Sequence, residues 1–152
     1  MSVRVGLISD THGLLRPEAL AALRGSEQIL HAGDIGGADV LDALRALAPV
    51  VAVRGNNDRG AWADALAETQ TVDIGGVRIH LLHDLSTLAL DPAAAGIAAV
   101  ISGHSHQPKI ERRGAVLYVN PGSAGPRRFR LPISLARLSI LGGEIRAELV
   151  TL

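Results

Sequence analysis

The amino-terminal third of the chain alternates short apolar runs with segments that favour helices. The apolar runs are Val3 to Ser9, Gln28 to Ala32 and Val50 to Val53. Between them, Pro17 opens a helix that Gly25 ends, and a second helix runs from Ala38 to Ala48 before Pro49. This alternation predicts a βαβαβ unit, whose neighbouring strands are parallel and joined by right-handed crossovers. It restricts the first half of the chain to an α/β sheet.

Polar residues that suit metal or phosphate chemistry come directly after each of these three runs. Asp10 and His12 follow the first run, Asp34 follows the second, and Asn56 follows the third. In open parallel sheets, ligands collect beyond the carboxyl ends of the strands. We therefore expect these four side chains to lie near one another at one edge of the sheet.

The second half of the chain consists mainly of strand pairs separated by glycine turns. The predicted pairs are 68–74 with 77–82, 109–112 with 115–119, and 133–141 with 144–152. Pro92 to Ala95 is predicted to begin a short helix. The whole pattern predicts one domain, residues 1–152, in which a mixed, mostly parallel sheet packs on a sheet rich in hairpins, with helices outside.

Composition supports one compact domain and excludes several kinds of chemistry. Hydrophobic residues make up 47% of the 152 residues, which is enough for a substantial core. The chain has no cysteine, so disulfides and thiolate sites are excluded. The only aromatic residues are Trp62, Tyr118 and Phe129, too few to form stacking platforms for single-stranded nucleic acid.

Charge is balanced over the whole chain but not along it. The formal net charge is zero, yet from Ile101 onward there are 8 Lys or Arg against 3 acids. Such an excess can attract an anionic substrate. The first residues lack a signal-peptide pattern, and no apolar run approaches the ~20 residues of a membrane helix. We therefore predict a cytoplasmic protein that does not enter a membrane.

Histidines at two further strand ends complete a candidate metal site. His104 and His106 follow the apolar run 96–102 in the sequence Gly103-His104-Ser105-His106, and His83 follows the run 77–82. Residues two apart in an extended segment project to the same side. Carboxylate, amide oxygen and imidazole together suit hard or borderline divalent ions. Gly-Asp and Gly-Asn are also ordinary turn pairs, so neither pair alone indicates a metal site. The occurrence of all these motifs at strand ends in one chain predicts a dinuclear site in which Asp34 bridges the ions.

Two other histidines are predicted to be either structural or exposed. His31 lies inside the second apolar run, and His80 alternates within the run 77–82. His31 is close enough in sequence to Asp34 to contact that carboxylate from behind the metal site.

Taken together, these motifs resemble the calcineurin-like metallophosphoesterase superfamily. The matching residues are Asp10-Thr11-His12-Gly13, His31-Ala32-Gly33-Asp34, Gly55-Asn56, His83, Gly103-His104-Ser105-His106 and Asn120-Pro121-Gly122-Ser123. They look most like its small YfcE-like phosphodiesterase branch, and they span nearly the whole chain. The resemblance implies a two-sheet sandwich flanked by helices.

The resemblance also implies a ligand set and a reaction. One ion would take Asp10, His12, Asp34 and His106, and the other Asp34, Asn56, His83 and His104. The ions are most often Mn2+, with Fe, Zn or Ni as alternatives. A metal-bound hydroxide would then hydrolyse phosphodiesters, or phosphomonoesters, with a small phosphoester as the substrate.

The chain departs from the larger members of this superfamily at the position after the metal-binding asparagine. Those members carry a histidine there, proposed to protonate the leaving group, whereas this chain has Asn57. An amide has no useful pKa, so no side-chain acid is assigned and good leaving groups are favoured. Asp84, which follows His83, replaces the glycine usual in the small branch.

Substrate contacts are predicted from three residues beside the metal ligands. They are Asn57, Ser123 and Arg127. Ser123 ends the segment 120–123, whose Pro-Gly pair is equally typical of a type II turn.

Two other functions fit parts of the sequence. A retromer subunit of the vacuolar sorting machinery shares the implied fold and acts as a non-catalytic binding scaffold. A scaffold need not keep all seven ligands, and this chain keeps them. A nuclease would use the basic carboxyl-terminal third, but the chain lacks a long basic groove for a polymer. The sequence leaves the formation of a homo-oligomer open.

Overall fold

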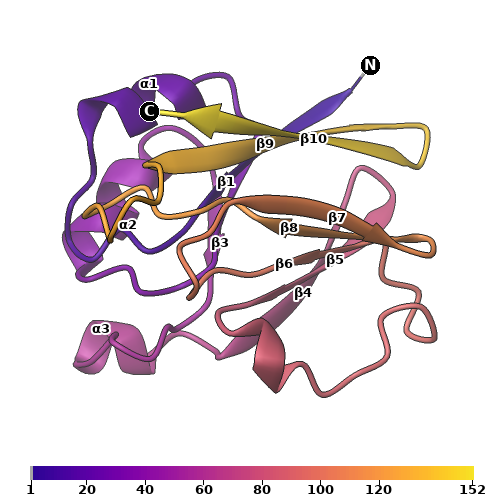
Figure 1. Cartoon of the computed structure of the whole chain (residues 1–152), viewed down its shortest axis with the longest axis horizontal. Coiled ribbons are helices and arrows are strands. Elements are labelled where there is room, and N and C mark those ends of the chain that lie inside the picture. Colours follow the sequence, from indigo (N-terminus) through magenta and orange to yellow (C-terminus); the bar gives the residue numbers. More distant parts are fainter. Residues whose placement is uncertain (1) are drawn as a thin grey trace.

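Two five-stranded sheets stack face to face in the computed structural model, which describes residues 2–152 (Figure 1). The first sheet has the strand order β10-β9-β1-β2-β3. Its strands are β1 (Val3–Ile8), β2 (Gln28–His31), β3 (Val50–Ala52), β9 (Ser134–Leu141) and β10 (Glu144–Thr151). β1, β2 and β3 are parallel, as the βαβαβ pattern predicts, and β9 joins the other side of β1 in the antiparallel sense.

The second sheet has the order β4-β5-β6-β8-β7. Its strands are β4 (Thr69–Ile74), β5 (Val77–Leu82), β6 (Ala99–Ile101), β7 (Lys109–Arg113) and β8 (Val116–Asn120). The hairpins β4–β5 and β7–β8 form its two sides, and β5, β6 and β8 are parallel in the centre. The predicted hairpin-rich sheet therefore has a parallel middle.

The main core lies between the two sheets. Val5, Leu7 and Leu30 of the first sheet pack in one cluster with Ile79 and Ile101 of the second. Each is essentially inaccessible to solvent. Burying a side chain of this size contributes about 1.5–3 kcal/mol relative to exposure, so this layer stabilises the packing of one sheet on the other. That packing also brings the edges of the two sheets together.

Helices cover the outer face of the first sheet. They are α1 (Pro17–Leu23) and α2 (Ala38–Arg45), with the short α3 (Ala61–Asp64) nearby (Figure 1). Leu23 and Leu44 pack with Ile8 and Ile29 in a second cluster. Gly6 on β1 is required here, because a Cβ at that position would overlap the Leu23 side chain. The helices fix β1 and β2, and with them the loops that carry Asp10 and Asp34.

Several details of the sequence prediction need correction. Residues 92–96 form a turn and not the predicted short helix, because Gly96 at φ +72° ends the segment after one turn. The sequence did not assign the third predicted hairpin, β9–β10, to a sheet, and the structure places it in the first. α3 and the 3-10 helix η1 (Leu85–Thr87) were not predicted; both are shorter than the periodic pattern that identifies a helix in sequence.

Candidate metal centre

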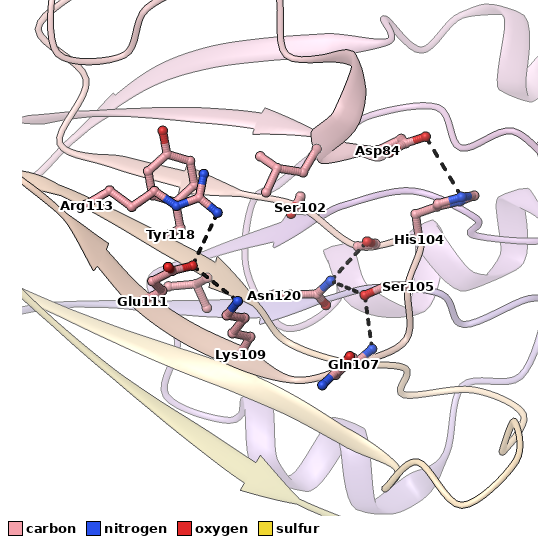
Figure 2. Close-up of a pocket in the computed structure, with 13 residues that line it drawn as sticks. Asp84, Ser102, His104, Ser105, Gln107, Lys109, Glu111, Arg113, Tyr118 and Asn120 are labelled. Carbon is pink, nitrogen blue, oxygen red and sulfur yellow. Dashed lines mark hydrogen bonds and ion pairs between the residues drawn. The ribbon is translucent and has the colours of Figure 1, made fainter.

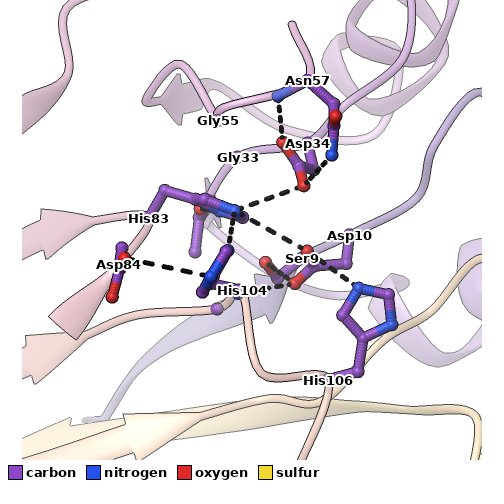
Figure 3. Close-up of polar contacts among 12 residues, drawn as sticks. Ser9, Asp10, Gly33, Asp34, Gly55, Asn57, His83, Asp84, His104 and His106 are labelled. Carbon is purple, nitrogen blue, oxygen red and sulfur yellow. Dashed lines mark hydrogen bonds and ion pairs between the residues drawn. The ribbon is translucent and has the colours of Figure 1, made fainter. Parts of the chain in front are cut away.

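The loops that follow β1, β2, β3, β5 and β6 meet at one edge of the sandwich (Figure 3). They bring together six of the seven predicted metal ligands, which are Asp10, His12, Asp34, His83, His104 and His106. Parallel strands end at the same edge of a sheet, and the two sheets are stacked so that their edges coincide. This is why residues from positions 10 to 106 converge.

One cluster consists of Asp10, His12 and His106. Asp10 Oδ1 lies 3.3 Å from His106 Nε2 and 3.7 Å from His12 Nε2. Asp10 Oδ1, His12 Nε2 and His106 Nδ1 are buried without a hydrogen-bond partner among residues 2–152. Buried polar atoms are nearly always satisfied, so Asp10 Oδ1 and His12 Nε2 fit a bound cation, whereas His106 faces Asp10 with Nε2 and not with its unpartnered Nδ1.

A second cluster consists of Asp10, Asp34 and His83. His83 Nε2 lies 3.3 Å from Asp34 Oδ2 and 3.9 Å from Asp10 Oδ1 (Figure 3). Asp34 Oδ2 is also 3.7 Å from His12 Nε2 of the first cluster. Both carboxylates therefore lie between the two groups of imidazoles.

His104 stands at the edge of the second cluster. Its Nδ1 is 3.3 Å from His83 Nε2, and its backbone N–H donates to Asp10 Oδ2 at 3.1 Å. Its side chain is 46% exposed and its Nε2 lies 3.9 Å from Asp84 Oδ2. The loops of the second sheet thus contact Asp10 through the His104 backbone N–H as well as through the imidazoles of His83 and His106.

The side chains of Asn56 and Asn57 have different contacts from those that the sequence predicted. The Asn57 side chain donates to Asp34 Oδ2 at 3.0 Å, and its backbone N–H donates to Asp34 Oδ1 at 2.9 Å. Asn56 is exposed, and its side chain makes none of the hydrogen bonds found within residues 2–152. The amide that contacts the metal cluster here is that of Asn57, predicted as a substrate contact.

Five of these ligands have a backbone conformation that L-residues rarely adopt. Asp10, His12, Asp34, His104 and His106 have φ values of 55°, 46°, 56°, 70° and 61°. A non-glycine residue in this region costs about 1–3 kcal/mol and persists only where the surroundings impose it. Hydrogen bonds between the loops do so: Asp10 N–H donates to Gly33 O at 3.0 Å and His12 N–H to Asp34 O at 2.9 Å. Such strain is concentrated at functional sites.

Glycines permit the closest approaches between these loops. A Cβ on Gly55 would overlap the Asp34 backbone and carboxylate, and one on Gly103 would overlap the Ser9 hydroxyl and the Asp10 carboxylate. Gly103 therefore lets the loop after β6 contact the loop after β1.

Asp58 ties together the loops after β2 and β3, a role that the sequence reading missed. Its carboxylate accepts from the N–H groups of Ile35 at 2.9 Å, Gly36 at 3.0 Å and Gly55 at 2.9 Å. Aspartate is a common turn residue, so its type fits this loop, but its partner loop could be identified only from the fold.

His31 links the first two loops from behind and is fully buried. Its Nδ1 accepts from Gly33 N–H at 3.1 Å, so its Nε2 carries the proton and donates to Thr11 Oγ1 at 3.0 Å. Thr11 Oγ1 donates in turn to Ile35 O at 2.7 Å. Burial lowers the pKa of His31 to about 4. His31 and His80 are structural, as predicted; His80 bonds Thr71 Oγ1 at 2.8 Å.

Hydrogen bonds also orient the metal-facing atoms. His83 Nδ1 lies 2.7 Å from Ala32 O and donates a proton to it, which directs Nε2 at the two carboxylates. Nε2 donates to Asp34 when the ring is protonated and offers a lone pair to a cation when the ring is neutral. Ser9 Oγ donates to Asp10 Oδ2 at 2.6 Å. Partners of this kind fix the orientation of ligating groups. Ser9 precedes the ligand motif and carried no sequence signal of its own.

Electrostatics keep the carboxylates ionised. Burial opposes ionisation of Asp34, but hydrogen bonds from His83 and Asn57 outweigh it and hold the pKa of Asp34 below its usual range. The pKa of Asp10 is lowered in the same way, against burial, by His12 and Ser9. Ionised carboxylates beside imidazole nitrogens are the donor set of a divalent cation site.

The other predicted contacts lie on the first cluster's side. Ser123 is buried and donates to Asp10 O at 3.1 Å, so it supports the Asp10 loop. Arg127 is exposed, and its side chain makes none of the polar contacts found within residues 2–152. Its neighbour Arg128, not singled out in the sequence, is close enough to lower the pKa of His106, after burial and against the effect of Asp10.

Residues 3–143 match the sequence profile of the calcineurin-like phosphoesterase superfamily domain. The chain belongs to this superfamily. A probable metallophosphoesterase of Methanothermobacter thermautotrophicus is 37% identical over 96% of this chain and 91% of its own. These relatives confirm the superfamily and the small branch that the motifs indicated.

Solved structures agree with this family assignment. An archaeal phosphodiesterase superposes with a TM-score of 0.81 at 23% identity, covering 97% of this chain and all of that one. Vps29 of Entamoeba histolytica, solved with Zn2+, gives a TM-score of 0.71 at 25% identity over 98% of this chain and 99% of its own. The predicted two-sheet sandwich of this superfamily is thus confirmed. Within residues 2–152, no helix has the length and apolar character needed to cross a membrane.

Proposed function

We propose that this metallophosphoesterase hydrolyses small phosphodiesters at a dinuclear centre. The observation that carries the proposal is the pair of three-residue clusters that share Asp10. In these clusters Asp10 Oδ1 and His12 Nε2 are buried and have no hydrogen-bond partner among residues 2–152. The first ion would be held by Asp10, His12, Asp34 and His106. The second would be held by Asp34, His83, His104 and an amide oxygen from Asn56, as the family pattern expects.

The chemistry follows from this arrangement. When bound, two such ions polarise a phosphoryl group and lower the pKa of the water that attacks it. Asp10 and Asp34 supply the negative charge that keeps the ions close together. Asp34 Oδ2 lies 3.7 Å from His12 Nε2 and 3.3 Å from His83 Nε2, which supports the proposal that Asp34 would contribute to holding both ions. Asn57 acts through the Asp34 carboxylate, Ser123 supports the backbone of the Asp10 loop, and the exposed Arg127 would meet the anionic substrate.

Leaving-group dependence is part of the proposal. The Asn57 amide cannot donate a proton to a departing oxygen at neutral pH. The leaving group must therefore depart unprotonated or take its proton from water. Activated aryl diesters should be cleaved much faster than alkyl diesters; equal rates on both would mean that another residue acts as the acid.

The experiment combines metal analysis with a substrate panel. Protein prepared with excess Mn2+ should approach two ions per chain, and it should hydrolyse bis(4-nitrophenyl) phosphate. Chelation should abolish the activity, and Mn2+, Zn2+, Fe2+ and Ni2+ should be compared for restoring it. A stoichiometry limited to one ion, with His83 unliganded, would contradict the dinuclear centre.

A non-catalytic scaffold is the second candidate, because Vps29 structures share the fold. The Entamoeba protein was solved with Zn2+, so metal binding by itself does not separate the two functions. Metal-dependent turnover does separate them. A chain that binds two ions but hydrolyses no ester in the panel would favour the scaffold. As part of the enzyme proposal, we also propose that the protein is cytoplasmic and that its substrate is a small phosphoester and not a nucleic-acid polymer.

A further inference from the structure

A separate cavity of about 270 Å³ lies beside the metal centre, on the second sheet (Figure 2). It is formed by β7, β8 and the loops that follow β5 and β6. Its walls include Leu85, Ser102, Gln107, Lys109, Tyr118 and Asn120. Sites for drug-sized ligands are roughly 300–1,000 Å³, so this cavity has room for one part of a substrate.

The His104 imidazole separates this cavity from the metal centre. Nδ1 of the ring lies 3.3 Å from His83 Nε2 in the metal cluster. Nε2 lies 3.9 Å from a carboxylate oxygen of Asp84, which lines the cavity. A phosphoryl group at the clusters would thus have the cavity directly beyond His104, within reach of one of its ester arms.

The charged residues of the cavity neutralise one another. Glu111 pairs with Lys109 at 3.3 Å and with Arg113 at 3.2 Å. The Arg113 guanidinium lies 4.4 Å from the centroid of the Tyr118 ring. Asp84 accepts hydrogen bonds from the Ser86 hydroxyl and N–H at 2.8 and 3.0 Å. With two acids and two bases on the walls, the cavity selects for neither an anion nor a cation.

The remaining surface combines apolar and hydrogen-bonding groups. Leu85, Val119 and the ring of Tyr118 are apolar. The Ser102 hydroxyl forms no side-chain hydrogen bond within residues 2–152. The Asn120 side-chain amide already donates to Gly103 O at 3.0 Å and to the Ser105 hydroxyl at 3.1 Å. Pockets of this kind hold a ligand by apolar contact and orient it by a few polar groups.

We propose that this cavity binds the retained arm of the phosphodiester, and that the arm is neutral, hydroxylated and of nucleoside size. The inference rests on the proposed phosphodiesterase function. The retained arm can extend past His104 into the cavity only if the phosphoryl group binds at the metal clusters. The substrate class is therefore diesters of a nucleoside-like alcohol, which bind more productively than diesters of small alkyl alcohols.

The test uses two diesters with the same leaving group. Thymidine 5'-(4-nitrophenyl phosphate) and methyl 4-nitrophenyl phosphate both release 4-nitrophenol, so a difference in kcat/KM reports the retained arm. With saturating Mn2+, we expect the thymidine ester to have a kcat/KM at least ~10-fold higher, the discrimination available from one good apolar and polar subsite.

A blocking variant locates the preference. Gln107→Trp changes an exposed wall residue and should fill the cavity. It should lower kcat/KM for the thymidine ester by about 10-fold and leave that for the methyl ester within about 2-fold. The control is Leu141→Trp, at a residue 56% exposed that does not line the cavity. Equal wild-type rates on the two esters, or equal losses in Gln107→Trp, would overturn the proposal.

A binding measurement keeps this result distinct from failure of the enzyme proposal. Tyr118 is the only tyrosine of the chain, so ¹³C-tyrosine labelling gives a single ring signal in an NMR spectrum. Millimolar thymidine should shift this signal in the wild type but not in Gln107→Trp. If neither diester is hydrolysed but the shift occurs, phosphodiester hydrolysis is wrong and the subsite stands. If thymidine causes no shift, the subsite is wrong whatever the activity.

Discussion

The two sheets contribute different chemistry to the metal centre. The first sheet supplies both carboxylates, Asp10 and Asp34, together with His12. The second sheet supplies only imidazoles, those of His83, His104 and His106. Each three-residue cluster takes two members from the first sheet and one from the second. The anionic half lies on one sheet, and the other sheet closes each cluster with a neutral ligand.

This division indicates that the metal centre depends on how the sheets stack. Neither sheet alone provides a complete cluster, so any change that shifts one sheet's loops relative to the other separates carboxylate from imidazole. It also indicates that the two halves should differ in their response to excess metal. Loss of charge from the first sheet leaves the two cations repelling each other, whereas loss of an imidazole weakens only one ion.

The largest effect is expected for Asp34→Asn in the first sheet. The substitution keeps the shape of the side chain but removes a full negative charge from the place where the two proposed ions would be held. We expect activity to fall by at least ~100-fold at saturating Mn2+, with one ion lost by metal analysis. Asp73→Asn, on an exposed carboxylate of β4, is the control. Recovery of the wild-type rate at high metal would assign the bridging role to another residue.

Gly103→Ala tests the contact between the two sheets directly. The new methyl group would overlap Ser9 and Asp10, and overpacking of this kind costs about 1–3 kcal/mol. We expect a lower Tm and a metal affinity reduced by about 10- to 100-fold. Gly37→Ala, at an extended backbone position where a Cβ meets only the exposed Asp39 side chain, controls for the loss of glycine flexibility. Unchanged metal affinity in Gly103→Ala would show that the loops adjust independently of the sheet stacking.

His83→Ala removes one imidazole of the second sheet and should be partly reversible. Excess metal can refill a weakened site by mass action. Activity measured against Mn2+ concentration should shift to higher metal and recover to within about 10-fold of wild type. Thermal melts check that the variant is folded. If His83→Ala stays inactive at high metal while Asp34→Asn recovers, the charge-based distinction between the sheets is wrong.

The two asparagines sharpen the description of the first sheet's half. Asn57→Ala removes one of the two hydrogen bonds that residue 57 gives Asp34, while the backbone N–H remains. We expect about a 10-fold higher Mn2+ requirement. Asn56→Ala is the matched variant. A larger loss in Asn56→Ala would mean that its amide turns inward to bind metal, as the family pattern expects; a loss confined to Asn57→Ala would transfer the ligand role to Asn57.

The last test concerns the pH dependence of stability in the metal-free protein and not its activity. Burial lowers the pKa of His31 to about 4, below the unfolded value of about 6.5. Between these values the unfolded state binds the proton and the native state does not, so the free energy of unfolding falls as pH drops from 6.5 towards 4. The full effect is roughly 3 kcal/mol. Denaturant melts of His31→Gln should show a shallower fall over this range; an identical slope would mean that His31 titrates normally.

Much of the fold could be predicted because its signals are local. β1, β2, β3 and β5 each end within one residue of the predicted boundary, and the polar residues predicted after them converge, except for the exposed Asn56. The sheet assignment of β9–β10 could not be predicted, because a hairpin's own turn does not specify which strand it will pair with. β9 pairs with β1, a contact between residues more than a hundred positions apart.

The sequence by itself identified the family and six of the residues that converge at the candidate metal centre. Side-chain type and position at strand ends are properties of short segments, and parallel strands bring their ends together without further information. Tertiary structure alone decided which asparagine contacts Asp34, that Asp58 joins two loops, and that His104 separates the clusters from a second cavity. These depend on distances between loops, which are set by the packing of two sheets and by positive φ at five ligands.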